Sequence, residues 1–123
     1  MEASKTVWEL ISETLQRHDI DIYPPATKNG ECKKEYVVVK GDGSSQIGAL
    51  SSEVHYYTFM LYVPNNRYNQ LEKFTQVVKG IVATDLNPML MPTGQETPDF
   101  YDDTVKAHMV SITYRNSVRN SQL

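Results

Sequence analysis

Residues 53–63 read EVHYYTFMLYV, and this run decides the fold. Its composition predicts a β-strand, because β-branched and aromatic side chains are enriched in strands. Both alternating faces of that strand carry apolar or aromatic side chains: Tyr57, Phe59 and Leu61 on one, Tyr56, Met60 and Tyr62 on the other. A strand of this kind is either central, with both faces covered, or it faces a partner chain on one side.

The preceding run, residues 35–40 (EYVVVK), predicts a second strand that pairs with the first as an antiparallel hairpin. Residues 41–52 connect the two strands and are polar, beginning with Gly41-Asp42-Gly43. Hairpin loops usually take about 2–5 residues, and longer loops tend to carry function. We therefore expect a long hairpin loop that takes part in recognition.

Two amphipathic helices flank this hairpin in the sequence. Residues 4–18 predict the first, with Ser4 as its N-cap and Val7, Ile11 and Leu15 on one face. Residues 66–85 predict the second, with Asn66 as its cap and Leu71 and Val78 on the buried face. The dipeptide Asn87-Pro88 is expected to end it.

The C-terminal third predicts two more strands. Residues 89–91 lie between two prolines and are expected to form a short edge strand, followed by a loop over residues 93–103. Residues 105–115 alternate Val110, Ile112 and Tyr114 and predict a long strand. The order α-β-β-α-β-β predicts a two-layer α+β fold, an antiparallel four-stranded sheet with both helices on one face. We expect one domain over residues 1–116 and a flexible tail over 117–123.

Composition excludes several classes of protein. The 123 residues carry a net charge of −3, so the basic excess typical of a nucleic-acid-binding protein is absent. Cys32 is the one cysteine, which excludes an internal disulfide. The start, MEASKTVWEL, has no apolar run of the kind a signal peptide needs, and no stretch reaches the length of a membrane span. We expect a soluble, intracellular protein with no membrane partner.

Motifs for catalysis or cofactor binding are missing, including GxGxxG, the P-loop, HExxH, GxSxG and the EF-hand loop. Three weaker constellations remain as alternatives. Asp99, Asp102 and Asp103 with His108 are candidates for a carboxylate-based enzyme or ligand site. A metal site would need His18, His55 and His108, or Cys32, to meet in space, and a nucleic-acid module would use Lys33, Lys34, Lys40 and the C-terminal arginines. We predict no enzyme activity, cofactor or metal.

Tyrosine is unusually frequent. The chain has eight tyrosines, and five of them lie between Tyr36 and Tyr68. Tyrosine is favoured at protein–protein interfaces because it is amphipathic. If the helices cover one sheet face, the other face shows tyrosines, which predicts a partner there.

The stretch PTGQETPDFYDDTVKAHMVSITYRN, residues 92–116, is the most specific part of the sequence. Together with Tyr62-Val63-Pro64 and the following YNQLE at 68–72, it resembles a family of small proteins from tailed phages and prophages of Gram-positive hosts. These proteins are labelled minor capsid, tail terminator or head–tail joining proteins. The resemblance covers about residues 5–116.

The resemblance implies a small α+β subunit of a hexameric ring that caps the tail tube and meets the head–tail connector. It implies a homo-oligomer in the virion, assembled in the host cytoplasm, with DNA passing through the ring without specific binding. It supplies no catalytic residues. The oligomer-interface residues that it suggests are Gly41, Asp42, Gly43, Ser44, Gln46, Tyr56, Tyr57, Tyr62, Phe100, Tyr101, Asp102 and Asp103.

Overall fold

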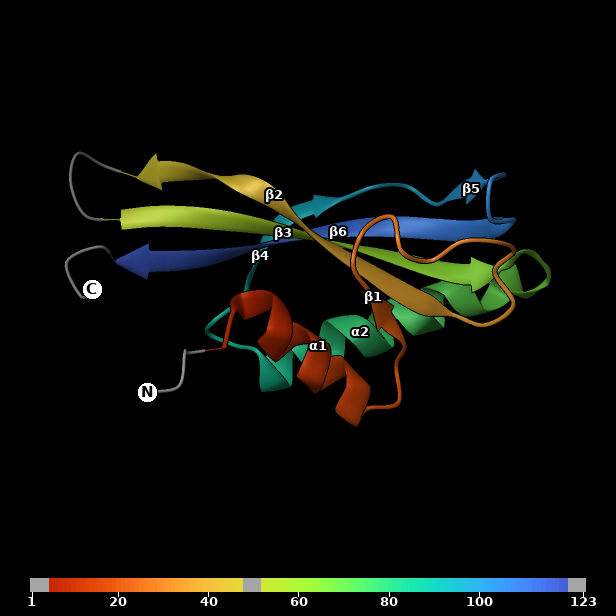
Figure 1. Ribbon diagram of the computed structural model, residues 1–123, viewed down its shortest axis with the longest axis horizontal. Helices are drawn as coiled ribbons and strands as arrows, with labels where there is room; N and C mark the ends of the chain where they lie inside the picture. Colours follow the sequence, from red (N-terminus) through yellow and green to blue (C-terminus); the bar gives the residue numbers. More distant parts are fainter. Residues whose placement is uncertain (1–4, 48–51, 120–123) are drawn as a thin grey trace.

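A twisted sheet lies over two helices in the computed structural model of the chain (Figure 1). The structure describes residues 5–47 and 52–119, with side chains for residues 5–44 and 53–116. The sheet is mixed and six-stranded, in the order β1-β2-β3-β6-β4, and β5 pairs with β6. In sequence order the elements are α1 (Val7–Arg17), β1 (Ile22–Tyr23), β2 (Tyr36–Ile47), β3 (Ser52–Pro64), the 3-10 helix η1 (Asn65–Gln70), α2 (Leu71–Asp85), β4 (Met91–Glu96), β5 (Phe100–Asp102) and β6 (Ala107–Arg119).

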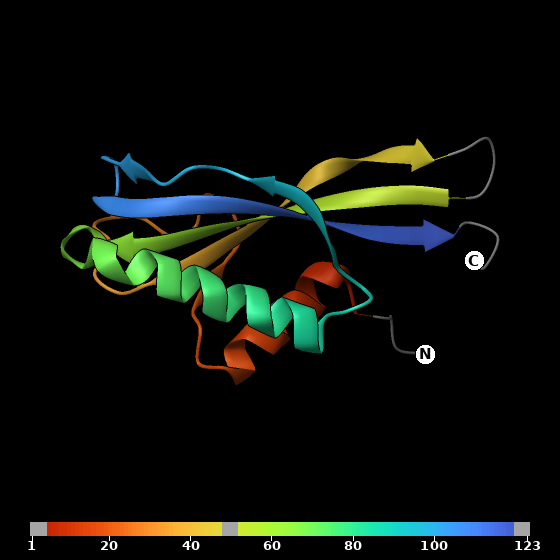
Figure 2. The ribbon, with the colours of Figure 1, turned by 180° about the vertical axis from the view of Figure 1, so that it is seen from behind.

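The α+β class and the two helices are as the sequence predicts. Both helices lie on one side of the sheet, and the view from behind in Figure 2 shows the same layering. The main core lies between them, where Ile11 and Leu15 of α1 and Val78 and Val82 of α2 pack against the sheet. Phe59 of β3 is 0% exposed at the centre of this core. The fold is held together by this apolar layer, since burial of apolar area dominates the stability of a small domain.

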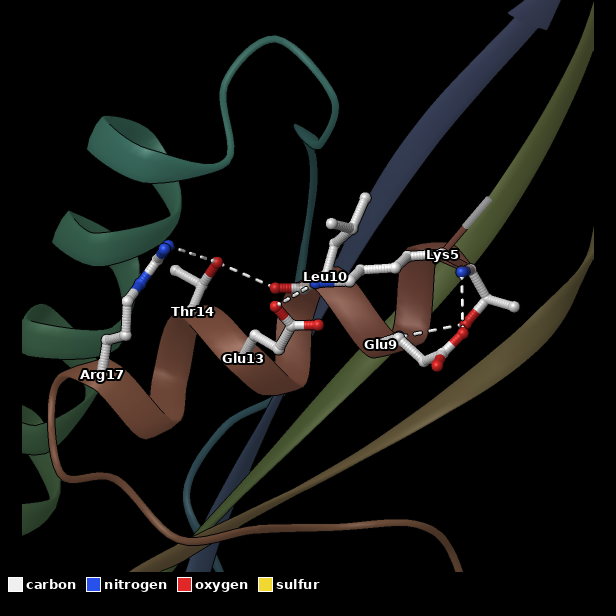
Figure 3. Close-up of polar contacts among 7 residues, drawn as sticks. Lys5, Glu9, Leu10, Glu13, Thr14 and Arg17 are labelled. Atoms are coloured by element: carbon white, nitrogen blue, oxygen red, sulfur yellow. Dashed lines mark hydrogen bonds and ion pairs between the residues drawn. The ribbon is translucent and has the colours of Figure 1, made fainter. Parts of the chain in front are cut away.

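The first helix begins with a capping box. Thr6 is the N-cap: its hydroxyl accepts a hydrogen bond from the Glu9 amide, and the Glu9 carboxylate accepts one from the Thr6 amide. These bonds satisfy two amide donors that a helix start otherwise leaves free. An ion pair joins the exposed side chains of Lys5 and Glu13, and in the last turn Arg17 donates a hydrogen bond to the hydroxyl of the buried Thr14 (Figure 3). The predicted cap Ser4 lies outside the described residues.

The second helix begins later than predicted. Residues Asn65–Gln70 form the 3-10 helix η1, in which every residue is exposed, and α2 starts at Leu71. Asn66 is therefore not the N-cap, because the chain makes 3-10 turns before Leu71, the first residue that the core buries. Asp85 is the last helical residue, two positions before Asn87.

The prediction of a four-stranded antiparallel sheet is wrong in two places. β1 is a two-residue strand parallel to β2, and the Val37 amide donates to the Asp21 carbonyl beside it. β5 is a three-residue strand within the segment predicted as a loop over residues 93–103. The edge strand predicted over residues 89–91 is displaced: β4 spans Met91–Glu96, and residues 89–90 lie in the turn before it. Strands as short as β1 and β5 have no periodic pattern of their own. They pair with β2 and β6, respectively, because the fold places them beside these strands.

The predicted hairpin loop over residues 41–52 is largely strand. Pairing of β2 with β3 resumes at Ser44–His55 after a bulge that begins at Gly41. Gly43 has φ +89 within this bulge, a conformation that glycine adopts without strain. Ladder bonds to β3, and not side-chain propensity, extend the strand to Ile47; residues 48–51 lie outside the described residues. In the same way β6 pairs with β3 through Arg119, so residues 117–119, assigned to a flexible tail, belong to the sheet.

Candidate functional site

The strands β2, β3 and β6 extend beyond the helices as a three-stranded arm, at the end of the sheet drawn on the left in Figure 1. The arm consists of residues 41–47, 52–57 and 114–119, paired as β2–β3 and β3–β6. Four predicted interface residues form the start of its outer strand and are exposed: Gly41, Asp42, Gly43 and Ser44. Gln46 pairs with Glu53 nearer the tip.

The outer strand of the arm is an open sheet edge. β1 pairs only with Val37 and Val38, and in the described part of the chain no strand pairs with the outer side of β2, the side away from β3, after that point. The Trp8 indole donates a hydrogen bond to the Val39 carbonyl at 2.8 Å, which closes the edge where α1 passes it. Beyond Trp8, an exposed edge presents backbone groups that can pair with another chain.

The sheet face opposite the helices has two parts. One part is closed by a second apolar cluster, in which Cys32, Tyr36, Val38 and Ala107 are buried. The chain between β1 and β2 covers this part, and the Cys32 amide donates to the Val105 carbonyl at 2.7 Å. The two-sided apolar character of residues 53–63 thus has an intramolecular explanation at this end: both faces are covered.

Tyr62, a predicted interface residue, packs within this second cluster. Its ring stacks on Tyr36 with centroids 4.8 Å apart, and Tyr23 meets Tyr36 edge-on at 5.6 Å. Burial raises the pKa of both Tyr36 and Tyr62. Burial likewise raises the pKa of the Cys32 thiol, the opposite of what an activated nucleophile requires. Tyr57 lies on the helix side and packs against the main core.

The other part of this face holds an open groove of about 690 Å³, which we call the open-face groove. Its walls come from four strands: Asp42 of β2, Tyr56 of β3, Thr113 and Arg115 of β6, and Pro92, Thr93 and Gln95 of β4. Sequence analysis named Asp42 and Tyr56 but had no signal for the β4 residues, because their approach depends on the pairing of β4 with β6.

Charge in the open-face groove is unevenly compensated. Lys40 lies 3.3 Å from one Asp42 oxygen, and the Thr58 hydroxyl donates to the other. Arg115 is exposed, and its guanidinium pairs with no carboxylate among the residues whose side chains are described. The groove therefore places a cation that no carboxylate with a described side chain neutralises in the same lining as a tyrosine.

Exposed aromatic side chains gather at the opposite end of the sheet, around β5. Phe100 is 47% exposed and Tyr101 is 43% exposed. Tyr68 of η1, which sequence analysis did not single out, donates to Asp99 at 2.9 Å and meets His108 edge-on at 4.7 Å. We refer to residues 99–103 as the β5 segment; it is acidic, aromatic and bound to η1.

The alternative carboxylate site does not assemble in this geometry. Asp99 accepts from Tyr68, while one Asp102 oxygen accepts from the Thr104 amide at 2.9 Å. Pairing places Tyr101 opposite His108 and Asp102 opposite Ala107, so Asp102 and His108 point to opposite faces of the sheet. Asp103 is exposed. These side chains spread over an exposed segment and do not converge in one pocket.

The three histidines are equally dispersed. His18 pairs with Asp85 at 2.8 Å, where the ends of α1 and α2 meet, and His55 lies 3.2 Å from Glu53. His55 is opposite Asn116 and His108 is opposite Val63, so they lie far apart along the same strand pair. No group of three His, Cys, Asp or Glu side chains in the described part of the chain is arranged to hold a metal ion.

No protein-family model matches the chain, and no curated protein matches it. Within residues 5–47 and 52–119, no helix combines the length and apolar character needed to cross a membrane.

Proposed function

We propose that the protein is a structural subunit of a tailed-phage virion, a tail terminator or head–tail joining protein that works as a ring. In this role it caps the tail tube and connects it to the head, with the tube protein and the connector as partners. The observation that carries the proposal is the three-stranded arm, which projects beyond the helices with an open edge. The resemblance of residues 92–116 to the phage family indicates the kind of assembly in which the arm would act.

The arm suits a subunit that assembles with copies of itself. A ring needs heterologous contacts, in which one surface of a subunit meets a different surface of the next. The open edge of β2 and the exposed β5 segment lie at opposite ends of the sheet (Figure 1), so a copy can meet two neighbours at once. The predicted interface residues lie in these two regions and in the groove, apart from Tyr57 and Tyr62, which are partly buried and pack against the two apolar clusters.

The charge of the chain is compatible with the passage of DNA. At net −3 the subunit has no basic excess with which to hold phosphates. Two of the lysines considered for nucleic-acid contact are paired with carboxylates, Lys34 with Asp21 at 3.6 Å and Lys40 with Asp42 at 3.3 Å. An acidic ring repels the phosphate backbone and lets DNA slide through.

Particles from the phage or prophage that encodes this chain provide the test. We expect cryo-electron microscopy of purified virions to locate the protein as a ring at the head–tail joint. In a deletion mutant, a missing terminator leaves tail tubes that overgrow and do not join heads, because nothing stops tube polymerisation.

The same experiment separates the alternative roles. A head-completion protein would leave tails of normal length and heads that lose DNA, and a minor capsid protein would be found in the head shell. Absence of the protein from purified virions, together with normal particles in the deletion mutant, would overturn the proposal.

A further inference from the structure

We infer that the β5 segment of one copy binds in the open-face groove of a second copy, with Phe100 against the groove and Asp103 paired with Arg115. The inference rests on the proposed self-assembly and specifies the two surfaces that meet. The occupant is thus a second copy of this chain.

Charge complementarity is the first argument. The groove carries Arg115, whose donors have no carboxylate partner among the residues with described side chains, whereas Asp42 is already satisfied by Lys40 and Thr58. The β5 segment supplies the complement, because Asp103 is exposed and forms no ion pair with a lysine, arginine or histidine in the described part of the chain. An arginine and a carboxylate can bind through two parallel hydrogen bonds, so the pair selects the relative orientation of the two groups as well as their opposite charges.

The second argument is that the β5 segment is exposed but held in place. The Tyr68 hydroxyl binds Asp99, the Thr97 amide donates to the Ser111 carbonyl, and Tyr101 packs edge-on to His108 at 5.2 Å. A fixed segment loses little conformational entropy on binding. Phe100, which is 47% exposed, is thus presented as a preorganised aromatic anchor of the kind that dominates interface energies.

The third argument is that the segment cannot reach the groove of its own chain. Phe100 is opposite Met109 of β6, and Arg115 follows six residues further along the same strand. At about 3.4 Å per residue the two positions are roughly 20 Å apart on one sheet face. Because β6 is a continuous paired strand between them, the contact has to form between two copies.

Sedimentation velocity of the full chain tests the contact with three single substitutions. We expect the wild-type chain to self-associate, and Phe100→Ser, Asp103→Arg and Arg115→Asp each to weaken association by about tenfold or more. Val77→Ser and Lys73→Glu are the matched controls on α2; Val77 is 49% exposed and Lys73 is exposed, and neither lies in the β5 segment or the groove. All five variants are expected to melt like the wild-type chain, because each changes an exposed side chain.

A charge exchange gives the decisive result. The chain carrying both Asp103→Arg and Arg115→Asp should recover the association that each single change removes, since the pair is restored with reversed polarity. The inference is overturned if the wild-type chain stays monomeric up to about 1 mM, the weak limit of specific association, or if the double variant does not recover. Either failure would reject this contact between copies. The proposed function would still be tested by the virion experiment, which locates the protein without reference to the contact.

Discussion

Replacing Tyr36 by alanine tests whether this tyrosine stabilises the fold or belongs to a surface that binds a partner. Tyr36 is 3% exposed and lies between the rings of Tyr62 and Tyr23, at 4.8 and 5.6 Å. Truncating a buried aromatic side chain to alanine costs about 3–5 kcal/mol, from lost burial and the cavity that remains. We expect the lower end, about 3 kcal/mol, because the second apolar cluster is small and lies under a loop that can settle into the cavity.

Urea denaturation and thermal melting measure this effect. For a chain of this size, 3 kcal/mol lowers the Tm by on the order of 10 °C. Tyr101→Ala is the matched control: its ring is 43% exposed, so the free energy of unfolding should change by less than about 1 kcal/mol. If Tyr36→Ala costs less than about 1 kcal/mol and instead weakens self-association, the intramolecular explanation of the two-sided strand is wrong, and Tyr36 belongs to a partner surface.

Three further predictions concern the bulge, the buried phenol and the helix cap. Gly43→Ala should destabilise the fold by about 1 kcal/mol in urea titrations, because Gly43 has φ +89. Gly41→Ala is the control and should change the stability little, because Gly41 has open space around it and no positive φ. Equal effects of the two substitutions would contradict the bulge geometry. Burial and the nearby Glu96 charge raise the pKa of Tyr114 to about 12. Its contribution to stability is therefore present below about pH 10, the pKa of an unfolded tyrosine, and is lost as the pH rises through about 12. Tyr114→Phe should flatten that part of the curve of unfolding free energy against pH. An unchanged slope would show that the pKa of Tyr114 is not raised in the folded protein. Thr6→Ala removes the N-cap of α1 and should cost about 1 kcal/mol by thermal melting, more than Lys5→Ala, whose ion pair with Glu13 is exposed.

The sequence by itself determined the elements whose pattern is local. The helical spacing of Ile11 and Leu15, and of Val78 and Val82, predicts the two helices that the structure contains. The alternation around Phe59 and Ile112 likewise predicts the two longest strands. These elements are readable because each buries a periodic face, and periodicity is a property of neighbouring residues.

Tertiary structure alone decided the rest. Residues 41–47 are polar and glycine-rich, and they become strand only because β3 supplies their hydrogen-bond partners. The second apolar cluster depends on a loop whose residues have no pattern, and it converts Tyr36 and Tyr62 from surface candidates into packed side chains. Tyr68 meets His108, and Asp42 and Arg115 come to line one groove, only after the strands pair. Contacts between residues far apart in the chain depend on sheet register and twist, which local propensity does not encode.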